Sequence, residues 1–315
     1  NQEAVVSSRM EWTISNLDEI LEYEADIEEY EEELSNKRSD IFETVLYHRT
    51  LNKAQKAIEE WNPMSQALIR WLHQNLLSFW RWAEKSPWHY KTEQNYLGEK
   101  NKQKISFIPI SPEKLTDGMD KLFHYINNPE DPILIKCALM HIEFEALHPF
   151  KDWNWRIWRM MITLLLWKAW AITAPHFYIS SFFEQFKDDY INYMKNVSKN
   201  NDWESWCIFF FKAVKSQAQN NLEIAENIKN LYEDLKIVFS QVLGSKYSTT
   251  ALDFLFTNPV FRNNKFTKKS WIPPQTASRF TRVLIEHNLI KIREESAWRR
   301  PALYSFEPLL ELVRI

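Results

Sequence analysis

Apolar side chains recur every three or four positions along most of this chain, which is the spacing of helices that bury one face. The spacing predicts helices over residues 39–60, 65–78, 132–147, 157–170, 180–197 and 202–229. The segment 157–170 is apolar on almost every side, as expected for a helix inside a core. Residues 80–110 lack the helical spacing and contain two short extended pieces joined by a polar turn, which indicates a β-hairpin. The chain is therefore predicted to be mainly α.

The two ends of the chain differ from this helical middle. Residues 15–34 are strongly acidic, a pattern that favours an exposed helix with a solvated face. From residue 248 onward the expected elements are short helices at 249–256, 263–270 and 274–288, then strands at 290–293 and 303–306. This order resembles a winged helix-turn-helix. We therefore expect an N-terminal part at 1–35, a core at 36–222, a connecting helix at 223–247 and a C-terminal module at 248–315.

Composition limits the function classes. The chain has 315 residues, 45% of them hydrophobic and 26% charged, as in globular proteins of about two domains. A net charge of −3 argues against a generally basic nucleic-acid binder. Cys137 and Cys207 lie in apolar surroundings, so we expect buried thiols and no disulfide framework. The chain shows no signal peptide and no apolar run long enough to span a membrane, so we expect a cytoplasmic protein.

One polar stretch interrupts the apolar helices. It reads His148-Pro149-Phe150-Lys151-Asp152-Trp153-Asn154-Trp155-Arg156-Ile157-Trp158-Arg159. The His148 imidazole can take a proton from an attacking hydroxyl, and Asp152 is a hard oxygen ligand suited to Mg²⁺. Arg156 and Arg159 can bind phosphate oxygens, and the start of the following helix can hold an anion. Together these groups fit phosphoryl or nucleotidyl transfer.

This stretch resembles the signature of the Fic family, H-P-F-x-D/E-G-N-G-R-x-x-R. The matching residues are His148, Pro149, Phe150, Asp152, Asn154, Arg156 and Arg159. The resemblance implies a protein adenylyltransferase that uses ATP and Mg²⁺ to transfer AMP to a Ser, Thr or Tyr hydroxyl of a target protein. It implies that His148 is the base and that Asp152 holds the metal. The implied nucleotide-binding residues are Phe150, Asn154, Trp155, Arg156 and Arg159.

Two further stretches resemble other parts of Fic proteins, so residues 36–222 are expected to form the catalytic core. Ser7 and Glu11 lie four apart, on one helix face, and match the inhibitory motif S/T-x-x-x-E-G/N. The resemblance implies that Glu11 pairs with Arg159 and spoils γ-phosphate binding. The hairpin resembles the Fic flap, whose edge could bind a target segment by strand addition. The expected docking residues are Gln94, Asn95, Tyr96, Leu97 and Gly98.

The C-terminal module leaves a second function open. A winged helix-turn-helix reads base edges from the start of its second helix. The candidate base contacts are Gln275, Thr276, Ser278, Arg279 and Arg282. The candidate phosphate contacts are Lys265, Lys268, Lys269, Arg299 and Arg300. The module could instead serve protein contacts or homodimer formation. The alternatives to an enzyme are thus a DNA-binding regulator whose core senses nucleotide, or a catalytically dead scaffold.

Tryptophan and glycine usage is unusual. The chain has 3 glycines and 15 tryptophans, although glycine usually makes up about 7% of residues. Family glycine positions are occupied by Trp12, Trp153 and Trp155, and glycine would also be the easier residue at Trp80, Trp82, Trp88, Trp158, Trp271 and Trp298. One hypothesis is that UGA codons, which some bacteria read as glycine, are rendered here as tryptophan. Real tryptophans at 153, 155 and 158 would favour the inactive scaffold.

Overall fold

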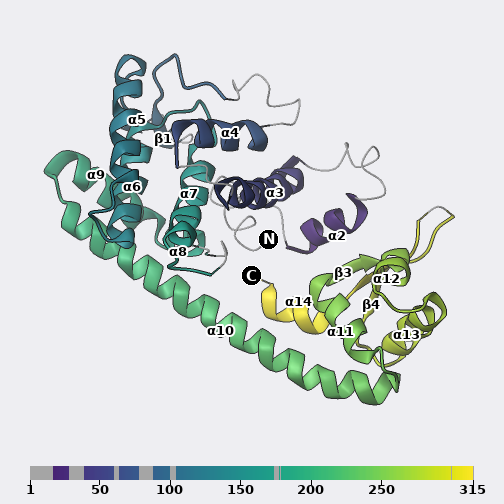
Figure 1. The fold of residues 1–315 in the computed structure, drawn as a ribbon. Coiled ribbons are helices and arrows are strands. Elements are labelled where there is room, and N and C mark those ends of the chain that lie inside the picture. Colours follow the sequence, from purple (N-terminus) through teal and green to yellow (C-terminus); the bar gives the residue numbers. More distant parts are fainter. Residues whose placement is uncertain are drawn as a thin grey trace. The chain divides into compact units, whose positions relative to one another are not determined.

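The computed structural model describes residues 17–27, 39–59, 64–77, 88–99, 104–173, 177, 179–298 and 300–314, and the structural statements below concern these residues. The chain divides into two compact units. One unit comprises residues 46–218, and the other joins residues 1–45 to residues 219–315. The prediction of a mainly α fold with small β elements is confirmed (Figure 1).

The unit at 46–218 consists mainly of helices in the residues described. Its elements are α3 (Ser39–Glu59, in part), α4 (Gln66–Leu76), β1 (Leu97–Glu99), β2 (Lys104–Phe107), α5 (Pro112–Asn127), α6 (Ile133–Leu147), α7 (Asn154–Lys168), α8 (Ser180–Gln185), α9 (Lys187–Asn200) and the first part of α10 (Trp203–Leu243). α7 is the central helix, because every residue from Arg156 to Leu166 is buried. α6 lies directly against it (Figure 1). The all-round apolar character of α7 follows from this position.

Helix α5 was not predicted, although its sequence has a clear helical pattern. Its buried residues recur at helical spacing and are Leu115, Met119, Leu122, Phe123 and Ile126. Pro112 stands at the first helical position, where its missing N–H costs nothing. Gly118 allows α5 to approach α6 closely, because a β-carbon there would collide with the Leu147 side chain. α5 thus supports the end of α6.

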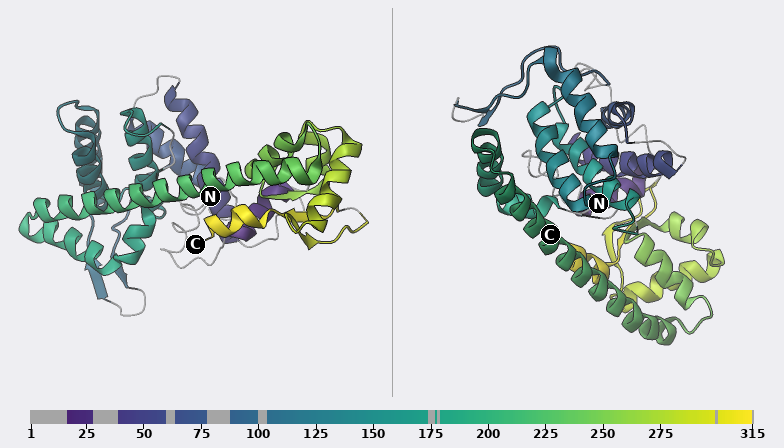
Figure 2. Two further views of the ribbon diagram at one scale, coloured as in Figure 1. Left: turned by 90° about the horizontal axis from the view of Figure 1, so that it is seen from below. Right: turned by 60° about the vertical axis from the view of Figure 1, so that its left-hand side comes forward.

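One other prediction for this unit needs correction. The single helix expected at 180–197 is two helices, α8 and α9, because Phe186 leaves helical geometry at φ −111° and ψ 40°. The expected helix and connection from 202 to 243 form one 41-residue helix, α10 (Figure 2). The hairpin is present, with Leu97 opposite Phe107 and Glu99 opposite Lys104. It projects from the helices of this unit (Figure 2).

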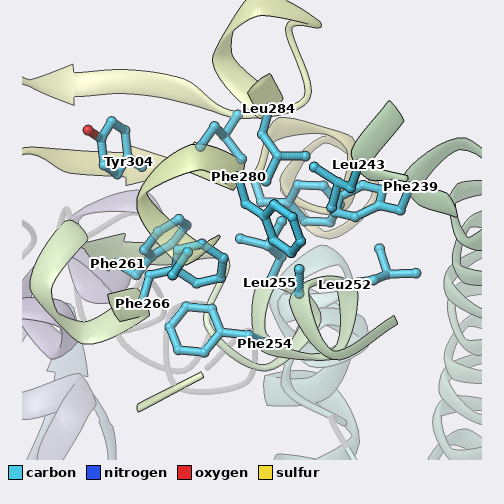
Figure 3. Packing of buried hydrophobic residues seen from close by; sticks show 14 of the residues in the cluster. Phe239, Leu243, Leu252, Phe254, Leu255, Phe261, Phe266, Phe280, Leu284 and Tyr304 are labelled. Carbon is cyan, nitrogen blue, oxygen red and sulfur yellow. The ribbon is translucent and has the colours of Figure 1, made fainter. Parts of the chain in front are cut away.

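The C-terminal module forms its own core. Its elements are α11 (Ser248–Thr257), β3 (Val260–Arg262), α12 (Asn263–Lys269), α13 (Pro274–Glu286), β4 (Lys291–Glu294), β5 (Leu303–Ser305) and α14 (Glu307–Val313). The sheet order is β3-β5-β4, antiparallel throughout. Aromatic and aliphatic side chains from the helices and from β3 pack together in this core, among them Phe254, Phe261, Phe266, Phe280 and Leu284 (Figure 3). The predicted helices and strands are present, and β3 and α14 are additions.

The acidic helix α2 (Leu17–Ile27) lies on this module, a contact that was not predicted. Ala25 packs in a small apolar cluster with Val260, Leu303 and Leu310. Asp26 is 2% exposed and its Oδ1 lies 2.7 Å from Arg262 Nε. Acidic residues on a helix usually indicate exposure, but several of those on α2 meet arginines.

The carboxylates of α2 that meet these arginines are spaced by four residues. Asp18, Glu22 and Asp26 therefore share one face of the helix. Arg293 Nη1 lies 2.7 Å from Glu22 Oε1, and Arg314 Nε lies 3.1 Å from Asp18 Oδ2. The three carboxylates thus meet three arginines in order along the helix.

Several tryptophans have a backbone conformation that suits glycine. Trp88, Trp153, Trp170 and Trp271 have φ of 74°, 61°, 58° and 60°, in the region that bulky residues rarely adopt. Trp170 follows the cap of α7, and the N–H of the next residue, Ala171, bonds to the Leu166 carbonyl at 2.9 Å. This bond pattern is a Schellman motif, in which glycine usually takes the left-handed place.

Exposure separates two groups of tryptophans. Trp170, Trp271 and Trp298 are 90%, 92% and 93% exposed, whereas Trp158 and Trp206 are 1% and 0% exposed. Large apolar side chains held fully in water gain nothing from burial. The exposed and left-handed group supports the hypothesis of natural glycines. Trp158 differs from that group, because it is buried within α7 against His141.

Candidate active site

The turn between α6 and α7 carries the polar motif. α6 ends at Leu147, and its cap His148 has a left-handed backbone with φ 43° and ψ 63°. α7 starts after Trp153, which is also left-handed. These two residues bound the turn and let the chain reverse quickly between the two core helices. The structure thus brings the candidate base, metal ligand and phosphate-binding residues of the motif to one turn and the helix start that follows it.

The side chain of Asn154 closes this turn. Its Oδ1 accepts from the Phe150 N–H at 2.8 Å, and its Nδ2 donates to the Phe150 carbonyl at 2.8 Å. Asn154 is 1% exposed, so both bonds form in a protected place, where hydrogen bonds are stronger. Asn154 therefore fixes the shape of the turn on which the other motif side chains stand.

Phe150 anchors the turn to α4. Its ring is fully buried and stacks on His73 with the ring centroids 3.9 Å apart. His73 Nε2 also lies 3.3 Å from the Asp152 carbonyl oxygen. Burial lowers the pKa of His73 to about 4, so this imidazole is neutral near pH 7. The sequence did not indicate this role, because His73 resembles an ordinary residue on the buried face of α4.

His148 has a carboxylate beside it. Its Nδ1 lies 3.6 Å from Glu145 Oε2, one turn back on α6, and the two side chains are 14% and 12% exposed. The distance is longer than a hydrogen bond, so the carboxylate lies beside the ring without bonding to it. Because Nδ1 faces Glu145, Nε2 is the nitrogen on the other side of the ring.

The two motif arginines lie under indole rings. The Arg156 guanidinium is 3.9 Å from the Trp153 ring centroid and 4.6 Å from that of Trp155. The Arg159 guanidinium is 4.4 Å from Trp155 and 5.2 Å from Trp158. Arg156 and Arg159 are only 1% and 2% exposed. The tryptophans therefore shield the groups that were predicted to bind phosphate.

A second buried histidine lies next to these rings. His141 is fully buried, its Nε2 lies 2.8 Å from Tyr190 Oη, and its ring centroid is 3.7 Å from that of Trp158. Burial, and then the charge of Arg159, hold the pKa of His141 well below its usual value. His141 is thus a neutral packing residue, and the accessible imidazole of the motif is His148.

Asp152 fits Mg²⁺ only as one of several ligands. Its Oδ1 accepts from the Trp153 N–H at 2.9 Å, and the residue is half-buried. Among the described residues, no group of three or more His, Cys, Asp or Glu side chains could hold a metal. Mg²⁺ often takes one or two protein carboxylates and completes its shell with phosphate oxygens and water. One carboxylate therefore suits a metal that arrives with a nucleotide.

The predicted docking residues of the hairpin divide into two groups. Gln94 Nε2 donates to the Pro109 carbonyl at 2.8 Å, and Asn95 Nδ2 donates to the Phe150 carbonyl at 3.0 Å. These two side chains tie the base of the hairpin together and to the motif. Leu97 and Gly98 belong to β1, and Tyr96 before them is 59% exposed. Ordered strand pairing starts at Leu97, three residues later than predicted.

The candidate DNA contacts lie mainly on α13. Gln275, Ser278, Arg279 and Arg282 are exposed and Thr276 is half-buried. Arg279 Nη2 donates to the Leu243 carbonyl at 3.1 Å. Lys268 and Lys269 are exposed, whereas Lys265 and Arg300 are half-buried. The predicted residues Ser7, Glu11, Trp12 and Arg299 lie outside the described part of the chain.

Comparison with known proteins agrees with the fold and the motif. Residues 63–166 match the model of the Fic/DOC family, and this span includes the turn and helix α6. The segment 63–166 is therefore similar to the Fic/DOC family, and solved Fic proteins share the fold of this chain. A probable protein adenylyltransferase of Aquifex aeolicus is 23% identical over 306 residues, which cover 92% of this chain and 84% of that protein.

Solved structures share the fold. A Fic family protein from Desulfovibrio desulfuricans has a TM-score of 0.60 and 16% identity, with 97% of this chain and 85% of that one covered. A Fic-domain signalling protein from Bacteroides thetaiotaomicron has a TM-score of 0.55 and 19% identity, with 71% and 85% covered. Within the described ranges, no helix combines the length and apolar character needed to cross a bilayer.

Proposed function

We propose that this protein is an adenylyltransferase that transfers AMP from ATP to a Ser, Thr or Tyr hydroxyl of a target protein. The observation that carries the proposal is the turn at 148–153 in a Fic domain, with His148 beside Glu145 at the end of α6. The related protein of Aquifex aeolicus, a probable protein adenylyltransferase, supports the same reaction class.

The reaction needs a base, a charge-neutralising site and a leaving group. The target hydroxyl oxygen attacks the α-phosphorus, and the bond to the bridging oxygen of the β-phosphate breaks. Pyrophosphate leaves with the bonding electrons, and the hydroxyl proton passes to His148 Nε2. Glu145, on the Nδ1 side of the ring, stabilises the imidazolium that forms.

The start of α7 supplies the phosphate site in this proposal. Its backbone N–H groups and the guanidinium groups of Arg156 and Arg159 attract phosphate oxygens. Phe150 and Trp155 complete the proposed nucleotide-binding residues. Mg²⁺, when bound with the nucleotide, neutralises phosphate charge, and Asp152 would hold it.

The N-terminal motif would inhibit the proposed activity. Glu11 would pair with Arg159 and thereby keep that arginine from the γ-phosphate, because one guanidinium cannot serve both anions. Ser7 would belong to the same inhibitory helix. A Glu11→Gly variant should then label itself faster than the parent, and equal rates would count against this restraint.

Incubation with labelled ATP and Mg²⁺ tests the proposal, with label on the protein itself as the readout. His148→Ala should lower the rate of labelling about 10²–10⁴-fold, as loss of a general base usually does. His124→Ala is the matched control, since His124 is exposed on α5 in the same unit. Both variants should be made in two backgrounds, one with tryptophan and one with glycine at positions 153, 155 and 158. Unchanged labelling by His148→Ala would exclude this base.

A DNA-binding regulator is the second candidate function. The exposed polar face of α13, with Gln275, Ser278 and Arg282, favours it. Against it, Arg262 and Arg293 are already in ion pairs with carboxylates of α2. A gel shift with duplex DNA at two salt concentrations distinguishes the candidates, because phosphate contacts make binding strongly salt-dependent.

A further inference from the structure

Lys91 contacts the chain on both sides of His148. Its Nζ donates to the Leu147 carbonyl at 3.0 Å, and its backbone N–H donates to the Pro149 carbonyl at 2.8 Å. The residues immediately before and after the candidate base are thus held by one lysine. No local sequence pattern indicated this, because Lys91 precedes the motif by more than fifty residues.

Lys91 is itself an unusual residue for this place. It is 3% exposed, although lysine is almost never fully buried. Its Nζ meets the C-terminal end of α6, where the helix dipole is negative and favours a cation. Burial lowers the pKa of Lys91 to about 8, so the ammonium form still predominates at pH 7. The buried ammonium of Lys91 is therefore stabilised by the Leu147 carbonyl, directly before His148.

The backbone conformation of His148 requires contacts that stabilise it. Its left-handed conformation is unfavourable for a residue with a β-carbon, and such conformations persist where surrounding contacts fix them. The His148 N–H bonds back to the Phe144 carbonyl at 2.8 Å, which fixes only the helix side. The two bonds from Lys91 hold the carbonyl groups of Leu147 and Pro149, the residues on either side of His148.

We propose that Lys91 is a positioning residue that holds His148 in its left-handed conformation and so aims its imidazole. The inference rests on the proposed function for its catalytic consequence, but its structural part does not. Asn95 adds a third contact to those of Lys91, because its Nδ2 donates to the Phe150 carbonyl at 3.0 Å. We call the contacts of Lys91 and Asn95 with the motif the brace. The segment 91–95 thus lies along the motif and bonds to the carbonyls of Leu147, Pro149 and Phe150.

The first test uses the nucleotide-free protein. Lys91→Met removes the ammonium and keeps the length of the side chain, and Lys91→Gln is a second variant in case the first does not fold. Lys136→Met is the matched control, because Lys136 is also buried and its Nζ also donates to a backbone carbonyl, that of Asn128. We expect faster amide hydrogen exchange at His148 and Lys91 in the Lys91 variants, and unchanged exchange at these amides in the control.

The second test separates turnover from nucleotide binding, in the chain with glycine at 153, 155 and 158. Misplacing a catalytic group by about 1 Å can cost about 10²-fold in rate, so Lys91→Met should lower kcat by about that factor. KM for ATP should stay within about twofold, because the two hydrogen bonds of Lys91 go to Leu147 and Pro149, which are not proposed nucleotide-binding residues. Lys136→Met should change neither constant beyond about twofold.

The outcomes distinguish this inference from the proposed function. If His148→Ala is inactive while both Lys91 variants keep the parental kcat, the positioning role is wrong and the proposed reaction stands. If His148→Ala keeps full activity, the proposed base is wrong. If no version transfers AMP, the exchange rates still decide. Unchanged exchange at the His148 amide in Lys91→Met would show that Lys91 does not position His148.

Discussion

Buried arginines occur in both units of this molecule, with different neighbours. In the C-terminal module, Arg262 is 2% exposed and lies 2.7 Å from carboxylate oxygens of both Asp26 and Glu294. In the Fic domain, Arg156 and Arg159 are equally buried, but indole rings cover them at 3.9 to 5.2 Å. The contacts described thus include opposite charge around Arg262 and aromatic faces around Arg156 and Arg159.

The difference bears on whether each guanidinium can still bind a phosphate group. Burial alone would lower the pKa of Arg262, but hydrogen bonds to Asp26 and Glu294 outweigh it and raise that pKa. A guanidinium engaged in this way holds the fold together. A ring takes the face of a guanidinium, whereas phosphate binds its N–H edge, so an indole contact does not use up the phosphate-binding capacity.

The largest effect is expected where the carboxylate pair is broken. Arg262→Met leaves Asp26 buried without this partner, which should lower the free energy of unfolding of the C-terminal module by about 3–5 kcal/mol. Urea unfolding followed by hydrogen exchange measures it. The double variant Asp26→Leu with Arg262→Met should be less unstable than Arg262→Met alone. Equal losses in the two would mean that the unpaired Asp26 carboxylate is not the cause of the instability.

The next effect concerns the ring-covered arginines. Replacing Trp153, Trp155 and Trp158 together by glycine should uncover Arg156 and Arg159 and free the turn for phosphate. Charge-assisted hydrogen bonds contribute about 1.5–3 kcal/mol each, so affinity for ATP–Mg²⁺ should rise about 10²-fold or more. Calorimetric titration of both versions measures it. Tight binding by the all-tryptophan chain would contradict this account of the phosphate site.

Acid should affect the carboxylate network of the C-terminal module. Burial alone would raise the pKa of Glu307, but hydrogen bonds to Arg314 and Ser305 outweigh it and lower the pKa to about 2. A depressed carboxyl pKa contributes stability above about pH 4.5, and this stability is lost as pH falls toward 2. We expect a loss of about 1–2 kcal/mol between pH 6 and pH 3 after allowance for solvent screening. Glu307→Gln should flatten this dependence in urea midpoints.

The smallest effect tests the glycine hypothesis away from both arginine sites. Trp271→Gly should stabilise the C-terminal module by about 0.5–1 kcal/mol, because relief of the left-handed strain exceeds the entropy cost of glycine. Trp206→Gly is the contrasting control. Trp206 is fully buried and its Nε1 donates to the Ala138 carbonyl at 2.8 Å, so its loss should cost about 3–5 kcal/mol or more. A destabilising Trp271→Gly would count against natural glycine there.

Local sequence pattern was enough for the motif and its two helices. The apolar run after Asn154 and the polar turn before it are visible without any distant contact, and the comparison with known families confirmed the Fic resemblance. The roles of the individual motif residues stay predictions. α5 was missed even though Leu115 and Met119 carry a readable helical spacing, so that error was one of interpretation.

Other features depend on partners far away in the sequence. Three carboxylates at a spacing of four indicate either a solvated face or a row of ion pairs, and only the positions of Arg262, Arg293 and Arg314 decide between them. Lys91 likewise gains its role from a carbonyl 56 positions later. Periodicity describes one helix at a time, so it cannot reveal such pairs.

The contact between α2 and the C-terminal module has a consequence for synthesis on the ribosome. Asp26 and Arg262 are 236 positions apart, and the Fic domain is translated between them. At about 5–20 residues per second, α2 waits on the order of ten to fifty seconds before its partner is made. During that interval its apolar side, with Leu21 and Ala25, is open to chaperones and to neighbouring nascent chains. A helix that is translated early therefore reaches its native contacts only when the last part of the module has emerged.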